Sequence, residues 1–102
     1  MASSGEIRVS LKKPIGAFIA IATETLERDG RCEIHGMSNA MAPAVQAAEK
    51  LVSLGYATMQ SFQTSSVQEG SSSRNKVVIA LDKTPQFQQL YDEYKTKRSN
   101  YR

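Results

Sequence analysis

Hydrophobic and polar residues change their spacing several times along the chain, and each spacing predicts a different element. Ile7, Val9 and Leu11 alternate with polar residues, which is the period-two pattern of a strand with one buried face. After Pro14, which suits the first turn of a helix, apolar residues recur every three or four positions until Gly30 ends the pattern. The apolar positions of this first helix are Ile15, Phe18, Ile19, Ala22 and Leu26.

The middle of the chain predicts a second strand and a second helix. The strand covers residues 31–35, turns Cys32 and Ile34 to one side, and is closed by Gly36. Pro43 can begin the helix that follows, and Gly55 can cap it. Its predicted buried stripe is Val45, Ala48, Leu51 and Val52. Because many of its side chains are alanines, we expect this helix to pack closely against a sheet or another chain.

The last third of the chain predicts an extended hairpin and a final helix. The predicted parts of the hairpin are a strand over 56–68, a turn over 69–75 with a flexible serine tip at 70–73, and a strand over 76–81 that buries Val77, Ile79 and Leu81. Thr84 can cap the final helix, with Pro85 at its first position. Its apolar stripe is Phe87, Leu90, Tyr91 and Tyr94, and the basic end at 95–102 is expected to fray.

This order of elements predicts an α/β two-layer sandwich. Strand, helix, strand, helix, strand, strand and helix follow one another, and right-handed crossovers place the two connecting helices on one face of a four-stranded sheet. With 102 residues, of which 40% are hydrophobic and 23% charged, the chain suits one globular domain and leaves no room for a second core.

Charge and cysteine content narrow the functional classes. The chain has 13 Lys and Arg against 10 Asp and Glu, a formal charge of +3, which favours a polyanionic partner without requiring one. Cys32 is the single cysteine, so neither an internal disulfide nor a metal site is predicted, and no cofactor is expected. The apolar run over residues 15–22 is too short to cross a membrane, and its helical continuation argues against a signal peptide.

The triplet Lys12-Lys13-Pro14 is the most informative feature of the sequence. Pro14 fixes a helix start and so places two ammonium groups beside the positive end of a helix dipole, an arrangement that an anion would stabilise. Phosphate is the obvious candidate. The alternative is that the two lysines of a turn are simply solvated.

Two further segments carry candidate binding residues. Ser38 and Asn39 lie at the next strand-to-helix junction and could hydrogen-bond phosphate or ribose, although they could equally form an ordinary capped turn. Arg74 and Lys76 lie in the hairpin and could follow a groove or remain in water. No catalytic constellation is evident, because the only histidine, His35, lies on the opposite face of its strand from Cys32, so an enzyme is not predicted.

Three stretches resemble the Alba family of archaeal chromatin proteins and their eukaryotic RNA-binding relatives. They are Ile7-Arg8-Val9-Ser10-Leu11-Lys12-Lys13-Pro14, then Gly36-Met37-Ser38-Asn39-Ala40-Met41, and then Ala44-Val45-Gln46-Ala47-Ala48-Glu49-Lys50-Leu51. The resemblance covers roughly residues 6–81. It implies the fold of the C-terminal domain of a bacterial translation initiation factor, a dimer, and nucleic acid bound across both subunits through its backbone.

The resemblance also implies a site. Lys12 and Lys13 would lie on the binding face, Ser38 and Asn39 beside them, and Arg74 with Lys76 on the hairpin arms. Archaeal members often have arginine where Asn39 stands and carry more charge in the hairpin. RNA is therefore the expected ligand, with DNA as a second one. The expected division is a flexible N-terminus at 1–5, an Alba-like nucleic-acid-binding domain at 6–81, and a C-terminal helix with a basic tail at 82–102.

Two functional hypotheses remain open at the level of sequence. The first is a dimeric protein of the cytoplasm or nucleus, without a membrane segment, that binds RNA and acts in RNA metabolism, translation control or chromatin organisation. The second is a subunit that pairs with another Alba-like chain inside a ribonucleoprotein such as ribonuclease P/MRP and contributes little RNA affinity itself.

Overall fold

The computed structural model describes residues 5–100, apart from the side chains of residues 69 and 98–100. Its elements, in chain order, are β1 (Glu6–Arg8), α1 (Ile15–Asp29), β2 (Arg31–Met37), the short 3-10 helix η1 (Ser38–Ala40), α2 (Met41–Ser53), β3 (Ala57–Glu69), β4 (Ser72–Lys83) and α3 (Phe87–Asn100). The predicted order of strands and helices is therefore confirmed, as is the α/β class.

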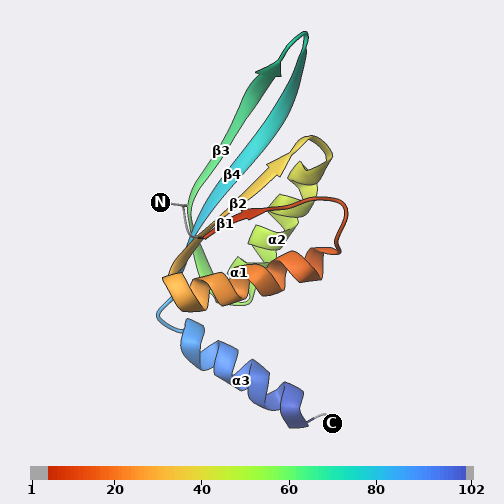
Figure 1. Cartoon of the computed structure of the whole chain (residues 1–102). Helices are drawn as coiled ribbons and strands as arrows, with labels where there is room; N and C mark the ends of the chain where they lie inside the picture. The colour runs from red at the N-terminus through yellow and green to blue at the C-terminus, as the bar shows by residue number, and fades with distance from the viewer. Residues whose placement is uncertain (1–4, 101–102) are drawn as a thin grey trace.

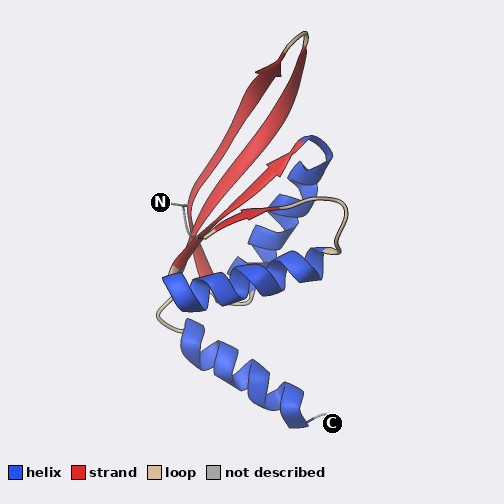
Figure 2. Cartoon of the chain, viewed as in Figure 1, coloured by secondary structure: helices blue, strands red, loops and turns tan. Residues whose placement is uncertain are grey.

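The strands form one mixed sheet in the order β1-β2-β4-β3 (Figure 1). β1 runs parallel to β2, whereas β4 is antiparallel to both of its neighbours, β2 and β3. Each parallel strand is followed by a helix, and α1 and α2 pack together on one face of the sheet (Figure 2). This is the predicted two-layer sandwich.

The core fills the space between that face and the two helices. Its largest fully buried side chains are Phe87, Leu26, Ile34, Leu51, Ile79, Leu81, Val77 and Cys32. The close approach of α2 depends on its alanines, because Ala44, Ala47 and Ala48 are all fully buried. Two threonines on α1, Thr23 and Thr25, are also buried, and each satisfies its hydroxyl by donating to the carbonyl four residues earlier, at 2.8 Å.

The first strand is shorter than its alternating pattern predicts. Ile7 and Val9 are buried as expected, and the Val9 N–H still donates to the His35 carbonyl at 2.9 Å. The chain then leaves the sheet in a turn, and Leu11 is 63% exposed. The prediction that Leu11 shares the buried face is therefore wrong, because alternation governs side-chain direction only while the backbone stays paired.

Helix α1 begins and ends close to where the sequence predicts. Pro14 is its N-cap residue with φ −66°, and Gly30 closes it in the left-handed conformation with φ 83°, donating its N–H to the Leu26 carbonyl at 2.9 Å. Phe18, Ala22 and Leu26 of the predicted stripe are buried.

The prediction that Gly36 ends the second strand is wrong. β2 continues to Met37, and Gly36 lies inside it. A Cβ atom at this position would lie 2.5 Å from the Ala40 carbonyl oxygen and 2.6 Å from the Ala44 Cβ. Glycine is needed here because the start of α2 passes directly against the strand, so the residue serves packing and not a turn.

The second helix differs from its prediction in its first residue and in which side chains are buried. It begins at Met41 after η1, so Pro43 lies in its first turn and does not begin it. Of the predicted stripe, Ala48 and Leu51 are fully buried, whereas Val45 is partly buried and Val52 is 39% exposed.

Gly55 ends α2 as predicted. It has φ 83° and donates to the Val52 carbonyl at 3.0 Å, while Tyr56 donates to the Leu51 carbonyl at 3.1 Å. These two bonds form a Schellman motif.

The hairpin is more regular than its serine-rich sequence suggests. The predicted seven-residue turn is a two-residue turn, because β3 continues to Glu69 and β4 begins at Ser72. Gly70, with φ 59°, takes the position at which a type II′ turn requires glycine. Residues 72–75 are consequently paired strand, so Ser72 and Ser73 of the predicted flexible tip at 70–73 lie in β4. A register shift between Met59 and Ser61 marks a bulge in β3.

The last helix begins later and runs further than predicted. Thr84 is not its N-cap residue, since the helix begins at Phe87, and the Thr84 hydroxyl donates instead to the Gly55 carbonyl at 2.6 Å. Pro85 lies in the turn before the helix, and α3 continues from Phe87 to Asn100, which makes most of the basic end helical. Phe87 is fully buried, whereas Tyr94 at the end of the predicted stripe is 51% exposed.

The molecule is elongated, at 54 × 27 × 26 Å. Figure 1 shows why: the hairpin projects from one end and α3 from the other. Within the described residues, no helix is long and apolar enough to cross a membrane. Residues 1–4 of the predicted flexible N-terminus and residues 101–102 of the predicted basic tail lie outside the described part of the chain.

Candidate functional site

The sheet topology brings the three predicted binding segments to one end of the molecule. β1 and β2 are parallel neighbours, so the loops that follow them leave the sheet at the same edge. β4 runs the opposite way and enters the sheet there, with Lys76 opposite Met37, the last residue of β2. We call this the cationic edge, after its four basic side chains, Lys12, Lys13, Arg74 and Lys76.

Lys12 and Lys13 are exposed in the turn that leads to α1. The turn is held at both ends, because the Lys12 N–H donates to the Ser10 hydroxyl at 3.3 Å and the Ala17 N–H donates to the Pro14 carbonyl at 3.0 Å. The N-cap residue of α1, Pro14, makes no side-chain capping bond. Among the side chains that the structure describes, Lys12, Lys13 and Lys76 have no carboxylate partner. Their charge is therefore not neutralised within that part of the chain.

Ser38 and Asn39 are exposed in η1, between β2 and α2. Neither residue occupies a helix N-cap position, because Met37 and Ala40 stand there, and neither of those two makes a side-chain capping bond. Ser38 also has φ 55°, in the left-handed region that non-glycine residues rarely adopt. Backbone strain of this kind gathers at functional positions, which makes the junction a candidate contact.

The hairpin carries Arg74 and Lys76 along the same side of β4. Lys76 is the first residue of β4 that pairs with β2, and Arg74 precedes it farther out on the hairpin, opposite Val67 of β3. One guanidinium nitrogen of Arg74, Nη1, lies 4.0 Å from the Met37 sulfur, which draws the side chain toward the β2–α2 junction. The hairpin thus extends the cationic edge outward (Figure 2).

The sheet face that the helices leave uncovered carries a charge cluster around His35. Its Nε2 atom lies 3.1 Å from a Glu33 carboxylate oxygen, and its Nδ1 atom lies 3.8 Å from Glu6. Glu6 in turn pairs with Arg8 at 2.9 Å. Only the contact between His35 and Glu6 joins β2 to β1, and ion pairs near the surface contribute little stability.

Cys32 lies on the other face of β2, inside the core, so it does not meet His35. Burial, reinforced by the nearby Glu33 carboxylate, raises the pKa of the Cys32 thiol to about 12. A thiol with this pKa stays protonated at neutral pH and is a poor nucleophile. Within the described residues, no group of three or more potential ligands could hold a metal ion.

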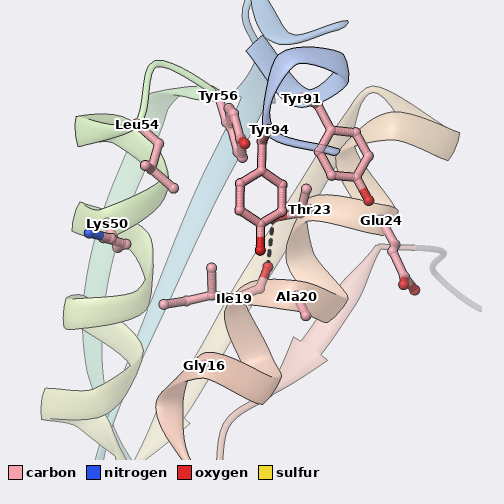
Figure 3. Close-up of a pocket in the computed structure, with 10 residues that line it drawn as sticks. All are labelled: Gly16, Ile19, Ala20, Thr23, Glu24, Lys50, Leu54, Tyr56, Tyr91 and Tyr94. Carbon is pink, nitrogen blue, oxygen red and sulfur yellow. Dashed lines mark hydrogen bonds between the residues drawn. The ribbon is translucent and has the colours of Figure 1, made fainter. Parts of the chain in front are cut away.

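A cavity of about 460 Å³ lies between the three helices (Figure 3). Ile19 and Ala20 of α1, Leu54 at the end of α2, and three tyrosines line it, with Glu24 and Lys50 at its margins; the tyrosines are Tyr56, Tyr91 and Tyr94. Tyr56 packs edge-on against Phe87 and Tyr91, and burial raises the pKa of its hydroxyl. The cavity shares Gly16 with the first turn of α1 but none of the predicted binding residues.

Sequence reasoning missed one feature of the cationic edge and the whole of the cavity. It did not find that Leu11 is exposed beside the lysines, since the alternating pattern favoured burial. It also missed the tyrosine-lined cavity, because three helices distant in sequence form it. The tyrosines of the last helix were the only available signal, and they read equally well as core residues.

The comparisons with known proteins concern the fold. No protein-family model and no curated protein matches the sequence. Among solved structures, the chain resembles ALBA1 from Trypanosoma brucei, with a TM-score of 0.88 over 99% of this chain and 88% of that one, at 20% sequence identity. It also resembles Alba from Thermoplasma volcanium, with a TM-score of 0.64 over 76% of this chain and 99% of that one, at 18% identity.

Both neighbours are Alba proteins, and the first is superposed over 99% of the chain. The sequence resemblance carried by the Lys-Lys-Pro and Gly-Met-Ser-Asn-Ala-Met stretches pointed to the same architecture. The chain therefore has the Alba fold.

Proposed function

We propose that the chain binds nucleic acid, RNA in preference to DNA, through the phosphate backbone and as a dimer. The observation that carries the proposal is the cationic edge: basic side chains from two distant segments lie at one end of the sheet, and Lys12, Lys13 and Lys76 have no carboxylate partner among the described side chains. Uncompensated cations along an extended surface attract a polyanion, and release of its counterions drives binding.

The neutral polar side chains near the basic residues favour RNA as the ligand. Ser38 and Asn39 add hydrogen-bonding groups between the two basic segments, and the hairpin continues them with hydroxyl and amide side chains. Such groups can bind phosphate oxygens and the ribose 2′-hydroxyl, which only RNA has. The resemblance to eukaryotic RNA-binding relatives favours the same ligand. Cytoplasm or nucleus stays the predicted location.

The dimer has a candidate surface on the edge strand of the sheet. β3 ends the sheet, and its helix-facing side chains Met59 and Phe62 are 38% and 48% exposed. Val52 on the adjoining helix α2 is 39% exposed. We call these three residues the apolar edge. A second Alba-like chain that covered it would bury apolar surface and protect the free strand edge.

The test is charge reversal at Lys12 and Lys13. Lys12→Glu/Lys13→Glu should weaken binding to a 20-nucleotide RNA at least tenfold without unfolding the protein, because both side chains are exposed. If the wild-type dimer neutralises about four to six phosphates, its log-log salt slope should be about −3 to −4, and the variant's slope should be shallower. The same titration with DNA of matched sequence measures the preference for RNA.

The control is Lys50→Glu/Lys83→Glu, which lowers the formal charge by the same amount at the opposite end of the sheet. This variant should lose less than threefold, since long-range attraction alone is largely screened at physiological salt. Undiminished RNA binding by the Lys12/Lys13 variant, or equal losses in both variants, would remove the assignment of the cationic edge.

A further inference from the structure

Leu11 is the most exposed of the large hydrophobic side chains in the described chain, at 63%. It occupies a turn directly before Lys12 and Lys13, where polar residues, glycine or proline are usual. Isolated apolar residues on a surface are common, but this one lies inside the cationic edge. The exposed ring of Pro14 extends the apolar area on the other side of the lysines.

The loop holds Leu11 in this exposed position. Before it, Val9 is still bonded to the His35 carbonyl at 2.9 Å. After it, the Lys12 N–H is bonded to the Ser10 hydroxyl, and Pro14 has the fixed φ of its ring, −66°. Leu11 is therefore presented outward, next to two ammonium groups, by a loop with bonded ends.

We propose that Leu11, together with the Pro14 ring, contacts the face of an unstacked nucleobase while Lys12 and Lys13 bind the flanking phosphates. This inference rests on the proposed function and makes it more specific. Phosphates offer nothing to an apolar side chain, whereas base faces do, and in a duplex those faces are covered by stacking. The ligand class that fits is RNA with unpaired segments, such as single strands and loops.

A membrane surface is the other partner that combines anionic and apolar groups. The structure favours RNA, because the cations continue from the loop onto a long hairpin whose outer part, residues 61–75, carries mostly hydroxyl and amide side chains. Stable membrane attachment needs a larger apolar face than Leu11 and Pro14 provide.

Leu11→Ser tests the inference against two ligands, a 20-nucleotide unstructured RNA and the same RNA annealed to its complement. We expect affinity for the unpaired RNA to fall about fivefold, as for loss of one buried leucine contact, with an unchanged salt slope. Affinity for the duplex should change less than twofold. Leu11→Met should restore binding, and thermal unfolding should match the wild type.

Ile21→Ser is the matched control, since Ile21 is 39% exposed on α1 and lies outside the cationic edge. It should leave both affinities unchanged. Unaltered binding of unpaired RNA by Leu11→Ser, an equal loss for both ligands, or a loss seen only with vesicles of anionic phospholipid would overturn the inference. Failure of the wild type to bind any RNA would instead remove the proposed function, so the two failures are distinguishable.

Discussion

At Gly36 a single hydrogen atom in place of a side chain allows β2 and α2 to meet. The Ala40 carbonyl oxygen and the Ala44 Cβ lie 2.5 and 2.6 Å from where a Cβ atom would be placed, and both belong to backbone or to a short side chain that cannot rotate away. The helix start must therefore move if any other residue stands here. Because Ser38 and Asn39 of η1 lie along the chain between Gly36 and these two contacts, the same movement would displace a candidate binding segment.

Gly36→Ala should accordingly destabilise the protein by about 3 kcal/mol, the upper part of the range for overpacking. Gly16→Ala is the control, since nothing lies within 4 Å of its added Cβ and alanine favours a helix. It should be neutral or stabilising by about 0.5 kcal/mol. Urea unfolding of the three proteins measures both effects, and equal stability of Gly36→Ala and wild type would contradict the packing account.

Single residues also show where sequence reasoning reaches its limit. Val9 and Leu11 have equivalent places in an alternating pattern, yet one is buried and the other is 63% exposed. The difference lies in the pairing partner, because β2 supplies a carbonyl for Val9 and the chain turns away immediately after. Similarly, Gly36 reads as a turn glycine until the position of α2 is known. The exposure of Leu11 and the role of Gly36 both depend on contacts with residues of other elements.

Among the elements, α3 joins the core chiefly through its first residue, Phe87, with Leu90 and Tyr91 packed beside it. Phe87 is fully buried, with its ring centroid 5.1 Å from that of Tyr56 and 5.4 Å from that of Tyr91. Thr84 fixes the approach, since its hydroxyl donates to the Gly55 carbonyl at 2.6 Å. The helix is thus attached to the end of α2 and to β4 by packing and by a partly buried hydrogen bond.

Phe87→Ala should destabilise the whole protein by about 3 to 5 kcal/mol, the usual cost of emptying a buried aromatic site. Tyr94→Ala, on the same helix but 51% exposed, should cost less than about 1 kcal/mol. Thermal unfolding followed by circular dichroism should show one transition in each case. A Phe87→Ala protein that melts like the wild type would mean that α3 is an appendage and not a part of the core.

The order of elements could be predicted because each has a clear spacing of apolar residues and clear boundary residues. Pro14 and Gly30, for example, stand at the two ends of α1. Lengths could not be predicted as well. The serine-rich segment at 72–75 has poor strand propensity, but it pairs residue by residue with 66–69 across a two-residue turn. Pairing with a partner strand overrode local propensity there, as it commonly does in sheets. The same effect extends the hairpin beyond the cationic edge.

For the whole molecule, the candidate site follows from topology more than from any local motif. Lys12 and Lys76 are distant in sequence, yet parallel pairing of β1 with β2 and antiparallel entry of β4 place both at one edge. Sequence could name these residues through a family resemblance, but only the strand order shows that they share a surface. The basic residues of one chain cover a short stretch of backbone, so a dimer would extend the polyanion-binding surface.

A substitution in the apolar edge tests whether the proposed dimer forms through this surface. Phe62→Glu places a charge where a partner chain would cover β3, so the variant should run as a monomer of 11.2 kDa where the wild type runs at twice that mass. Its log-log salt slope for RNA should fall to about half, because one subunit contacts half the phosphates. Ile21→Glu, an equally drastic change on α1, should leave mass and slope intact. Light scattering after size exclusion distinguishes the outcomes: a Phe62→Glu dimer would refute the assigned surface, and a wild type that is monomeric until another Alba-like chain is added would favour the heterodimeric subunit.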